Sequence, residues 1–229
     1  MRYLITGANR GLGLEFTRQL IARGDQVIAT CRNPAQADAL RQIAKSSHGL
    51  TAILALDITN AQSVAAFAKS LEHESLDVLL NIAGRLTRGG TPDAFNYDEI
   101  RDDFEINAIG TLRVVEAALP ALRRGANKTI VNMSSKMGSI ADNQGGASYA
   151  YRMSKAALNI ATRSLAIDLK PEGFIAFVMH PGWVQTDMGG PHAHITPETS
   201  VSSLLARIDQ ADANDSGEFL EWNGGYIPW

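Results

Sequence analysis

The sequence has very little cysteine, and Cys31 is its single thiol. One cysteine excludes an internal disulfide framework and fits a reducing cytoplasm. Long apolar runs are missing as well: no stretch reaches about 18 apolar residues, and the run at 1–7, MRYLITG, is too short for a signal peptide. These absences predict a soluble, cytoplasmic protein.

An excess of charge of one sign is also absent. The 229 residues carry 21 Lys and Arg against 24 Asp and Glu, a formal net charge of −3, which gives no indication of a nucleic-acid or anionic-membrane partner. His192 and His194 stand together in one loop without acidic or thiol partners, so they are expected to be exposed, and no metal is expected.

What the chain does contain is a strict alternation of short apolar runs and amphipathic stretches. Strands are expected at 2–6, 26–30, 51–56, 78–81, 129–134, 175–180 and near 217–222, and helices near 13–23, 35–45, 61–72, 97–122, 151–170 and 198–208. This alternation predicts an α/β fold, a doubly wound parallel sheet of about seven strands with helices on both faces. Because no repeat or linker divides the chain, one domain over 1–229 is expected.

A glycine-rich loop, TGANRGLG, lies between the first expected strand and the first expected helix. Glycines there let the backbone approach a pyrophosphate closely, and the helix N-terminus offers amide donors and the positive end of its dipole. The spacing Gly-x-x-x-Gly-x-Gly differs from the Gly-x-Gly-x-x-Gly fingerprint. A turn that binds no ligand is the alternative interpretation.

Tyr151 and Lys155 stand four residues apart in a segment that has no Gly or Pro from 153 to 170. On a helix this spacing puts the phenol and the ammonium group on one face. A neighbouring cation favours the phenolate, which suits acid–base chemistry. Taken alone, such a pair also describes two ordinary surface neighbours.

Several motifs in order resemble the short-chain dehydrogenase/reductase family, and within it the compact carbonyl reductases related to C-factor. The resemblance covers nearly the whole chain. It rests on TGANRGLG at 6–13, LDIT at 56–59, NIAG at 81–84, Asn107 in FEINAIGT, VNMSS at 131–135, the pair Tyr151 and Lys155, and PGWVQT at 181–186.

The resemblance implies a Rossmann fold and four catalytic residues: Ser135, Tyr151, Lys155 and Asn107. Tyr151 would be the acid or base, and Lys155 would hold the nicotinamide ribose and lower the pKa of the tyrosine. Ser135 would orient the substrate oxygen, with Ser134 and Ser139 as competitors for that role. Asn107 would bind a water that connects Lys155 to solvent.

The resemblance also implies a set of cofactor-binding residues along the chain. Asp57 would accept from the adenine amino group, although a helix-capping or strand-end carboxylate is an alternative for this residue. The full set is Gly7, Asn9, Arg10, Gly11, Leu12, Gly13, Arg32, Asp57, Ile58, Asn81, Ala83, Gly84, Tyr151, Lys155, Pro181, Gly182, Val184 and Thr186.

Charge at the second strand favours NADP over NAD. An acidic residue at the end of that strand would pair with the ribose hydroxyls of NAD, whereas this chain has Arg32 there and Arg10 in the glycine-rich loop. Guanidinium groups suit a phosphate because of their bidentate geometry. Both side chains are also compatible with solvated surface arginines.

The expected function is therefore an NADP(H)-dependent oxidoreductase that moves hydride between the nicotinamide and a small carbonyl or alcohol. A flap at 187–200 would cover the substrate, and Ala156 and Ala157 would allow close helix packing in a homodimer or homotetramer, with a monomer as the alternative. The rival is a C-factor-like signalling or morphogenetic protein with little or no turnover. A nucleotide-sugar epimerase would need Gly-x-x-Gly-x-x-Gly and a larger C-terminal domain.

Overall fold

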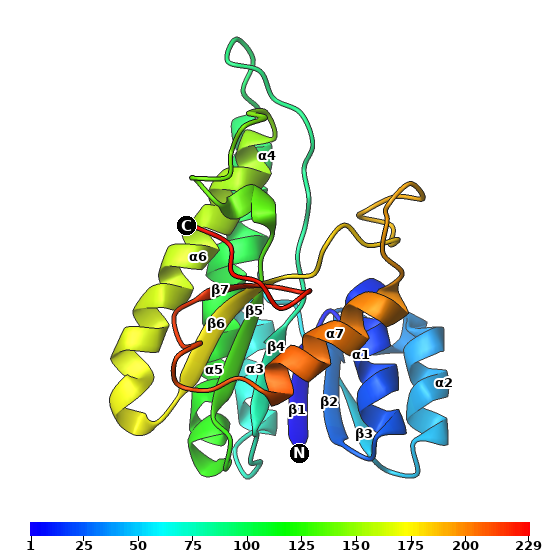
Figure 1. Ribbon diagram of the computed structural model, residues 1–229. Helices are drawn as coiled ribbons and strands as arrows, with labels where there is room; N and C mark the ends of the chain where they lie inside the picture. The colour runs from blue at the N-terminus through cyan, green and yellow to red at the C-terminus, as the bar shows by residue number, and fades with distance from the viewer.

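All strands of the protein join one parallel sheet (Figure 1). The computed structural model describes residues 1–229. The strands are β1 (Arg2–Thr6), β2 (Gln26–Cys31), β3 (Thr51–Ala55), β4 (Val78–Asn81), β5 (Thr129–Met133), β6 (Ile175–His180) and β7 (Phe219–Glu221). Their order, β3-β2-β1-β4-β5-β6-β7, reverses direction between β1 and β4. Ligands of open α/β sheets bind at the carboxyl ends of the strands beside such a reversal.

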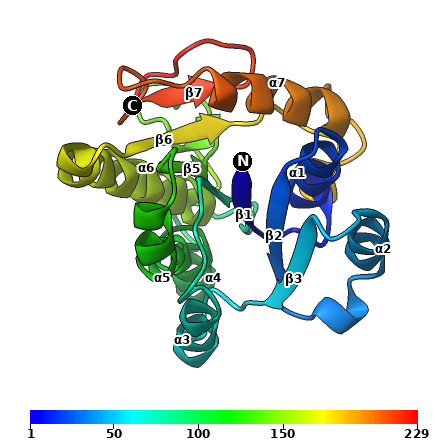
Figure 2. The same cartoon turned by 90° about the horizontal axis from the view of Figure 1, so that it is seen from below.

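Helices cover both faces of the sheet, as the view from below shows (Figure 2). The helices are α1 (Gly11–Ala22), α2 (Asp38–Ser46), α3 (Ala61–Ser70), α4 (Tyr97–Phe104), α5 (Gly110–Arg124), α6 (Tyr149–Leu169) and α7 (Pro197–Asp209). The first two and α7 pack on one face, whereas α3, α5 and α6 pack on the other. Helix α4 and the first turns of α6 rise beyond the carboxyl edge of the sheet.

Two hydrophobic cores result from the alternation of side chains along each strand. Tyr3 and Ile5 point into the core under α1, α2 and α7, whereas Leu4 points into the core under α3, α5 and α6. All three side chains are fully buried. None of the helices combines the length and the apolarity that crossing a membrane requires.

The expected elements agree with the observed ones except at a few boundaries. The expected helix 97–122 is interrupted: α4 and α5 are separated by a π-helical turn at Glu105–Ile109. The expected flap at 187–200 ends earlier, because Thr196 caps α7 by accepting from the amide of Thr199, and the helix begins at Pro197. We therefore call residues 187–196 the flap.

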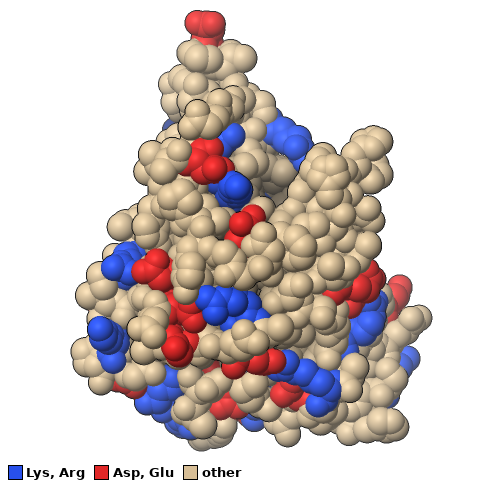
Figure 3. Space-filling model, viewed as in Figure 1, with Lys and Arg blue, Asp and Glu red and all other residues tan.

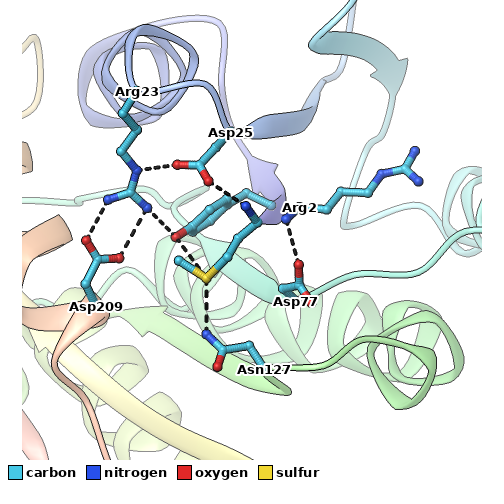
Figure 4. A network of polar contacts seen from close by, with 8 residues as sticks. Arg2, Arg23, Asp25, Asp77, Asn127 and Asp209 are labelled. Carbon is cyan, nitrogen blue, oxygen red and sulfur yellow. Dashed lines mark hydrogen bonds and ion pairs between the residues drawn. The ribbon is translucent and has the colours of Figure 1, made fainter.

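Arg23 holds the amino edge of the sheet together (Figure 4). Its guanidinium donates to Asp209 at the end of α7 at 2.6 Å and to the Tyr3 hydroxyl on β1 at 2.5 Å, and it also pairs with Asp25. Asp25 in turn accepts from the amino group of Met1 at 2.7 Å. This network joins α1, α7 and the chain start at the edge opposite the carboxyl ends.

Replacing Arg23 by Met should lower the free energy of unfolding by about 1–3 kcal/mol, because Asp25 is 93% buried and would lose its guanidinium partner. Urea denaturation measures this change. As a control, Arg41→Met removes a guanidinium from an exposed pair and should cost less than about 0.5 kcal/mol. Equal losses in the two variants would contradict a structural role for the network.

Candidate active site

The loop between β1 and α1 leaves the first turn of α1 open to an anion. Gly7 and Gly11 have φ angles of +67° and +53°, in the left-handed region that favours glycine. A Cβ on Gly13 would stand 2.3 Å from the Gly7 carbonyl oxygen, so only glycine fits where the loop folds back on itself. No side chain caps α1 and no acidic residue lies in its first turn. Its free amides and its dipole therefore suit a phosphate.

Thr6 joins the ends of β1 and β4, where the strand order reverses. Its Oγ1 accepts from the amides of Ile82 at 3.0 Å and Ala83 at 3.1 Å. A Cβ on Gly7 would stand 3.0 Å from the Ala83 Cα, so the two loops touch through their backbones. Asn81 is buried at the end of β4, and its Oδ1 has no hydrogen-bond partner within the protein. A bound polar ligand would satisfy this oxygen.

Asp57 follows β3 at the same edge of the sheet. Its Oδ1 accepts from the hydroxyl and the amide of Thr59 at 2.7 Å and 3.0 Å, and these bonds, with the charge of Arg32, lower the pKa of the carboxyl. The turn thus occupies the Asp57 Oδ1, and the Oδ2 is left to accept from a donor on a ligand. Arg32 is exposed and has no ion-pair partner, whereas Arg10 pairs with Asp187 of the flap at 2.9 Å.

Tyr151 and Lys155 lie on the first turns of α6, and only 6% and 5% of their surfaces are exposed. The helix begins directly after Ala147 and Ser148, whose φ angles of +51° and +47° turn the chain sharply into it. The Lys155 Nζ lies 5.8 Å from the centre of the Tyr151 ring and donates to the Met133 carbonyl at 2.8 Å. The ammonium group is therefore fixed at the carboxyl end of β5, beside the phenol.

Burial dominates the ionisation of both side chains. It raises the pKa of Tyr151 to about 12, an effect that the Ser135 hydrogen bond and the charge of Arg88 oppose and that the charge of Asp103 reinforces. Burial also lowers the pKa of Lys155 to about 8, against the charge of Asp103. The expected lowering of the tyrosine pKa by Lys155 stays a prediction, and among the protein's own groups the charge of Arg88 also lowers this pKa.

Ser135 is the serine that accompanies the phenol. The hydroxyl of Ser134 donates to Asn159 at 2.6 Å, and that of Ser139 donates to a backbone carbonyl of the C-terminal tail at 2.5 Å. Both competitors therefore have structural partners away from Tyr151. The Ser135 hydroxyl accepts from the Met137 amide at 3.2 Å, and it is the serine hydroxyl that favours the ionised form of the phenol.

Asn107 lies in the π-helical turn between α4 and α5, and such turns are frequent at functional sites. Its side chain accepts from the amide of Arg85 and donates to the carbonyl of the same residue, both at 2.8 Å. It also donates to the Ser154 hydroxyl at 2.9 Å. A Cβ on Gly84 would stand 3.2 Å from the Asn107 Oδ1 and 3.6 Å from the Lys155 Nζ, so both groups border one small space.

A hollow opens above these residues (Figure 3), between a tall projection and a shorter one. In the matching view of Figure 1, the tall projection contains α4, the start of α6 and the loop before α4, and the shorter one is the flap. Thr186 precedes the flap and lies within 3.6 Å of a Cβ placed on Gly11, which brings this segment to the glycine-rich loop.

The remaining expected residues lie along the same edge or lead into the flap. Gly182, with φ of +82°, turns the chain out of β6, and Val184 bridges to Ile195 across the base of the flap. The expected cofactor-binding residues also include Asn9, Leu12, Ile58 and Pro181.

No group of three or more His, Cys, Asp or Glu side chains is arranged for a metal ion. His194 instead packs edge-on against Trp183, with ring centres 4.8 Å apart.

Comparison with known proteins assigns this arrangement to a family. A model of the short chain dehydrogenase family matches residues 2–194. The chain belongs to the short chain dehydrogenase family. This match confirms the resemblance seen in the sequence motifs. As a member of the family, the protein is an oxidoreductase with a nicotinamide cofactor.

C-signal of Myxococcus xanthus is 46% identical to this short chain dehydrogenase over 164 residues, which cover 72% of this chain and 99% of that protein. The 1-hydroxy-2-glutathionyl-2-methyl-3-butene dehydrogenase of Rhodococcus sp. strain AD45 is 36% identical and covers 99% of this chain and 98% of that protein.

Solved structures of carbonyl reductases also resemble this short chain dehydrogenase. The carbonyl reductase Sniffer of D. melanogaster has a TM-score of 0.93 and 34% identity, over 100% of this chain and 99% of that chain. The NADPH-bound carbonyl reductase from chicken fatty liver has a TM-score of 0.93 and 35% identity, over 100% of this chain and 94% of that chain.

The residues present fit the dinucleotide cofactor of a short chain dehydrogenase. The uncapped N-terminus of α1 suits a pyrophosphate, the unpartnered Oδ1 of Asn81 suits a donor, and Arg32 leaves its charge exposed. Sequence patterns located all of these residues. They gave no signal for the contact of Lys155 with Met133 or for the effect of the Arg88 charge on the phenol, because both involve segments far apart in the chain.

Replacing Lys155 by Met should remove a pH dependence of stability. Unfolded lysine titrates near 10.5 and the buried one near 8, so between these values the unfolded state binds more protons and the free energy of unfolding rises with pH. From pH 7 to pH 10, cofactor-free wild type should gain on the order of 2 kcal/mol over Lys155→Met in urea denaturation. Lys45→Met, on the exposed side of α2, should follow wild type. A constant difference between wild type and Lys155→Met would refute burial of the charge.

Proposed function

We propose that this protein is an NADP(H)-dependent carbonyl reductase in which Tyr151 is the acid–base residue. The observation that carries the proposal is the convergence of a buried phenol, ammonium group and serine hydroxyl at the end of β5, beside an uncapped phosphate-binding loop. Likeness to NADPH-bound carbonyl reductase from chicken fatty liver, and to a NADP-bound relative from Burkholderia multivorans, supports it.

In the proposed reaction a carbonyl group becomes an alcohol. The Ser135 hydroxyl donates a hydrogen bond to the carbonyl oxygen and orients it, and the Tyr151 phenol gives that oxygen its proton. The reduced nicotinamide, when bound, supplies the hydride and is oxidised. A proton from solvent then restores the phenol. The developing negative charge on the oxygen is thus met by two fixed donors, which is how such sites stabilise a transition state.

The raised pKa of Tyr151 preserves the protonated form of the phenol, which reduction of a carbonyl uses. With a pKa of about 12 the phenol of Tyr151 stays protonated at neutral pH, which is the form that donates to a carbonyl oxygen. Oxidation of an alcohol needs the phenolate, and forming it costs more in a buried site. Lys155, with a pKa of about 8, is mostly cationic at pH 7 and would hold the ribose hydroxyls of the nicotinamide half.

Asn107 completes the proposed proton path. Its amide is held by the backbone of Arg85 and by Ser154, so its Oδ1 faces the space that the Lys155 Nζ also borders. A water bound there would connect the ammonium group to solvent. On this proposal Asn107 is a positioning residue, because it acts on the reacting atoms only through Lys155.

A signalling role with little turnover remains a second proposal, favoured by the 46% identity to C-signal of Myxococcus xanthus. A purely structural use of the fold requires neither a buried phenol nor a buried ammonium group, and burying both costs free energy. Their retention supports turnover. The two proposals differ in how removal of the Tyr151 hydroxyl should change turnover.

Replacing Tyr151 by Phe should lower kcat for NADPH-dependent reduction of an aldehyde by about 10²- to 10⁴-fold, because the proton donor is lost. NADPH affinity, measured by fluorescence titration, should stay close to that of wild type. Tyr149→Phe is the matched control: its ring packs edge-on against Phe95, and its loss of hydroxyl should change kcat less than about threefold. Equal turnover by wild type and Tyr151→Phe would eliminate the proposed acid.

Replacing Arg32 by Ala should weaken NADPH binding roughly 5- to 10-fold and change NADH binding less than about twofold, since only NADPH carries the phosphate that the guanidinium would bind. Titration of both nucleotides measures the two affinities. Lys45→Ala, which removes an exposed cation from the neighbouring helix α2, should leave both unchanged. A parallel loss of NADPH and NADH affinity in Arg32→Ala would count against a phosphate contact.

A further inference from the structure

Arg88 bridges the two walls of the hollow above the site. Its segment is anchored on the tall side, where the Thr87 hydroxyl donates to Asp103 at 2.8 Å and a Cβ on Gly90 would stand 3.6 Å from the Tyr149 ring. From there the Arg88 Nη2 donates to the Met188 carbonyl of the flap at 3.0 Å. Residues 100 positions apart in the sequence are thereby joined across the opening.

The positive charge of Arg88 has no carboxylate partner, unlike those of Arg85 and Arg10. Arg85 pairs with Asp102 at 2.5 Å and with Asp103 at 3.4 Å, and Arg10 pairs with Asp187. Arg88 makes no ion pair, and its one side-chain hydrogen bond goes to a neutral carbonyl. A guanidinium has five N–H donors, so most of its donors remain free for a ligand.

This free charge acts on the proposed acid. Arg88 is the arginine whose charge favours the ionised form of Tyr151, which places it within electrostatic reach of the phenol. Figure 3 shows basic side chains on the flank of the tall projection that faces the hollow. A substrate whose carbonyl group contacts the phenol therefore extends into the field of an exposed, unpaired cation.

We propose that Arg88 is the receptor for a carboxylate of the substrate, so that this protein preferentially reduces carbonyl compounds that also carry a carboxylate. The proposal rests on the proposed function and deepens it by naming a substrate class. A carboxylate matches the charge of a single guanidinium and accepts from it bidentately. Arg88 alone supplies this charge, because the neighbouring Arg85 and Arg10 are already paired with carboxylates.

The carboxylate would also tie the flap to the bound substrate. Because one donor of Arg88 holds the Met188 carbonyl, the remaining donors can bind the substrate without releasing the flap. The Arg88 side chain then contacts the substrate on one side and the flap on the other. Arg88 is therefore a specificity-determining residue rather than an acid or base.

The kinetic test compares 4-formylbenzoate with its methyl ester, which differ in charge but little in shape. In wild type, kcat/KM with NADPH should be higher for the acid. Arg88→Gln should lower kcat/KM for the acid roughly 10- to 100-fold and for the ester less than about threefold, and Arg88→Lys should retain part of the preference. Arg101→Gln, which removes an exposed arginine from α4, should change neither value. Equal losses for acid and ester in Arg88→Gln would overturn the proposal.

A binding measurement that needs no turnover uses benzoate and benzamide as probes at constant ionic strength. Calorimetric titration of wild type should give tighter binding of benzoate, and Arg88→Gln should abolish the difference. Benzoate preference without NADPH-dependent turnover would overturn only the proposed function. Turnover that Tyr151→Phe abolishes, with equal binding of benzoate and benzamide by wild type, would overturn only the role of Arg88.

Discussion

The geometry of the site depends on the hydrogen bond between the Lys155 ammonium group and the Met133 carbonyl. This bond fixes the first turns of α6 on the carboxyl end of β5, and the phenol of Tyr151 is placed beside Ser135 as a result. A buried ammonium group without a carboxylate partner is costly, since one carbonyl replaces its hydration only in part. On the proposed function, the ribose of the nicotinamide cofactor would supply a polar partner from outside the chain.

The same low polarity sets the protonation state of the proposed acid. Burial holds Tyr151 in its neutral, proton-donating form, and it brings the pKa of Lys155 to about 8. The charges that reach this pair come from the wall above it, from Asp103 and Arg88. On the proposed function, the segment 85–90 would join acid–base properties to substrate selection, because the charge of Arg88 lowers the pKa of the phenol and its guanidinium donates to the Met188 carbonyl of the flap.

Periodicity and glycine positions were sufficient to predict most of the fold. The strands at 2–6, 78–81 and 175–180 were predicted with their observed bounds, because parallel strands buried on both faces are continuous apolar runs between helices. The π-helical turn that interrupts 97–122 was missed, since its residues are compatible with a regular helix. The flap was predicted too long, because the capping of α7 by Thr196 was not recognised.

The amino-acid sequence alone determined the family, the order of the strands and helices along the chain, and the identity of the candidate catalytic and cofactor-binding residues, because ordered motifs and local periodicity are written along the chain. Only the tertiary structure decided which serine accompanies Tyr151, that the charge of Arg88 reaches the phenol and that Arg88 has no carboxylate partner. These outcomes depend on contacts between segments distant in sequence and on burial, and both arise only when the chain has folded.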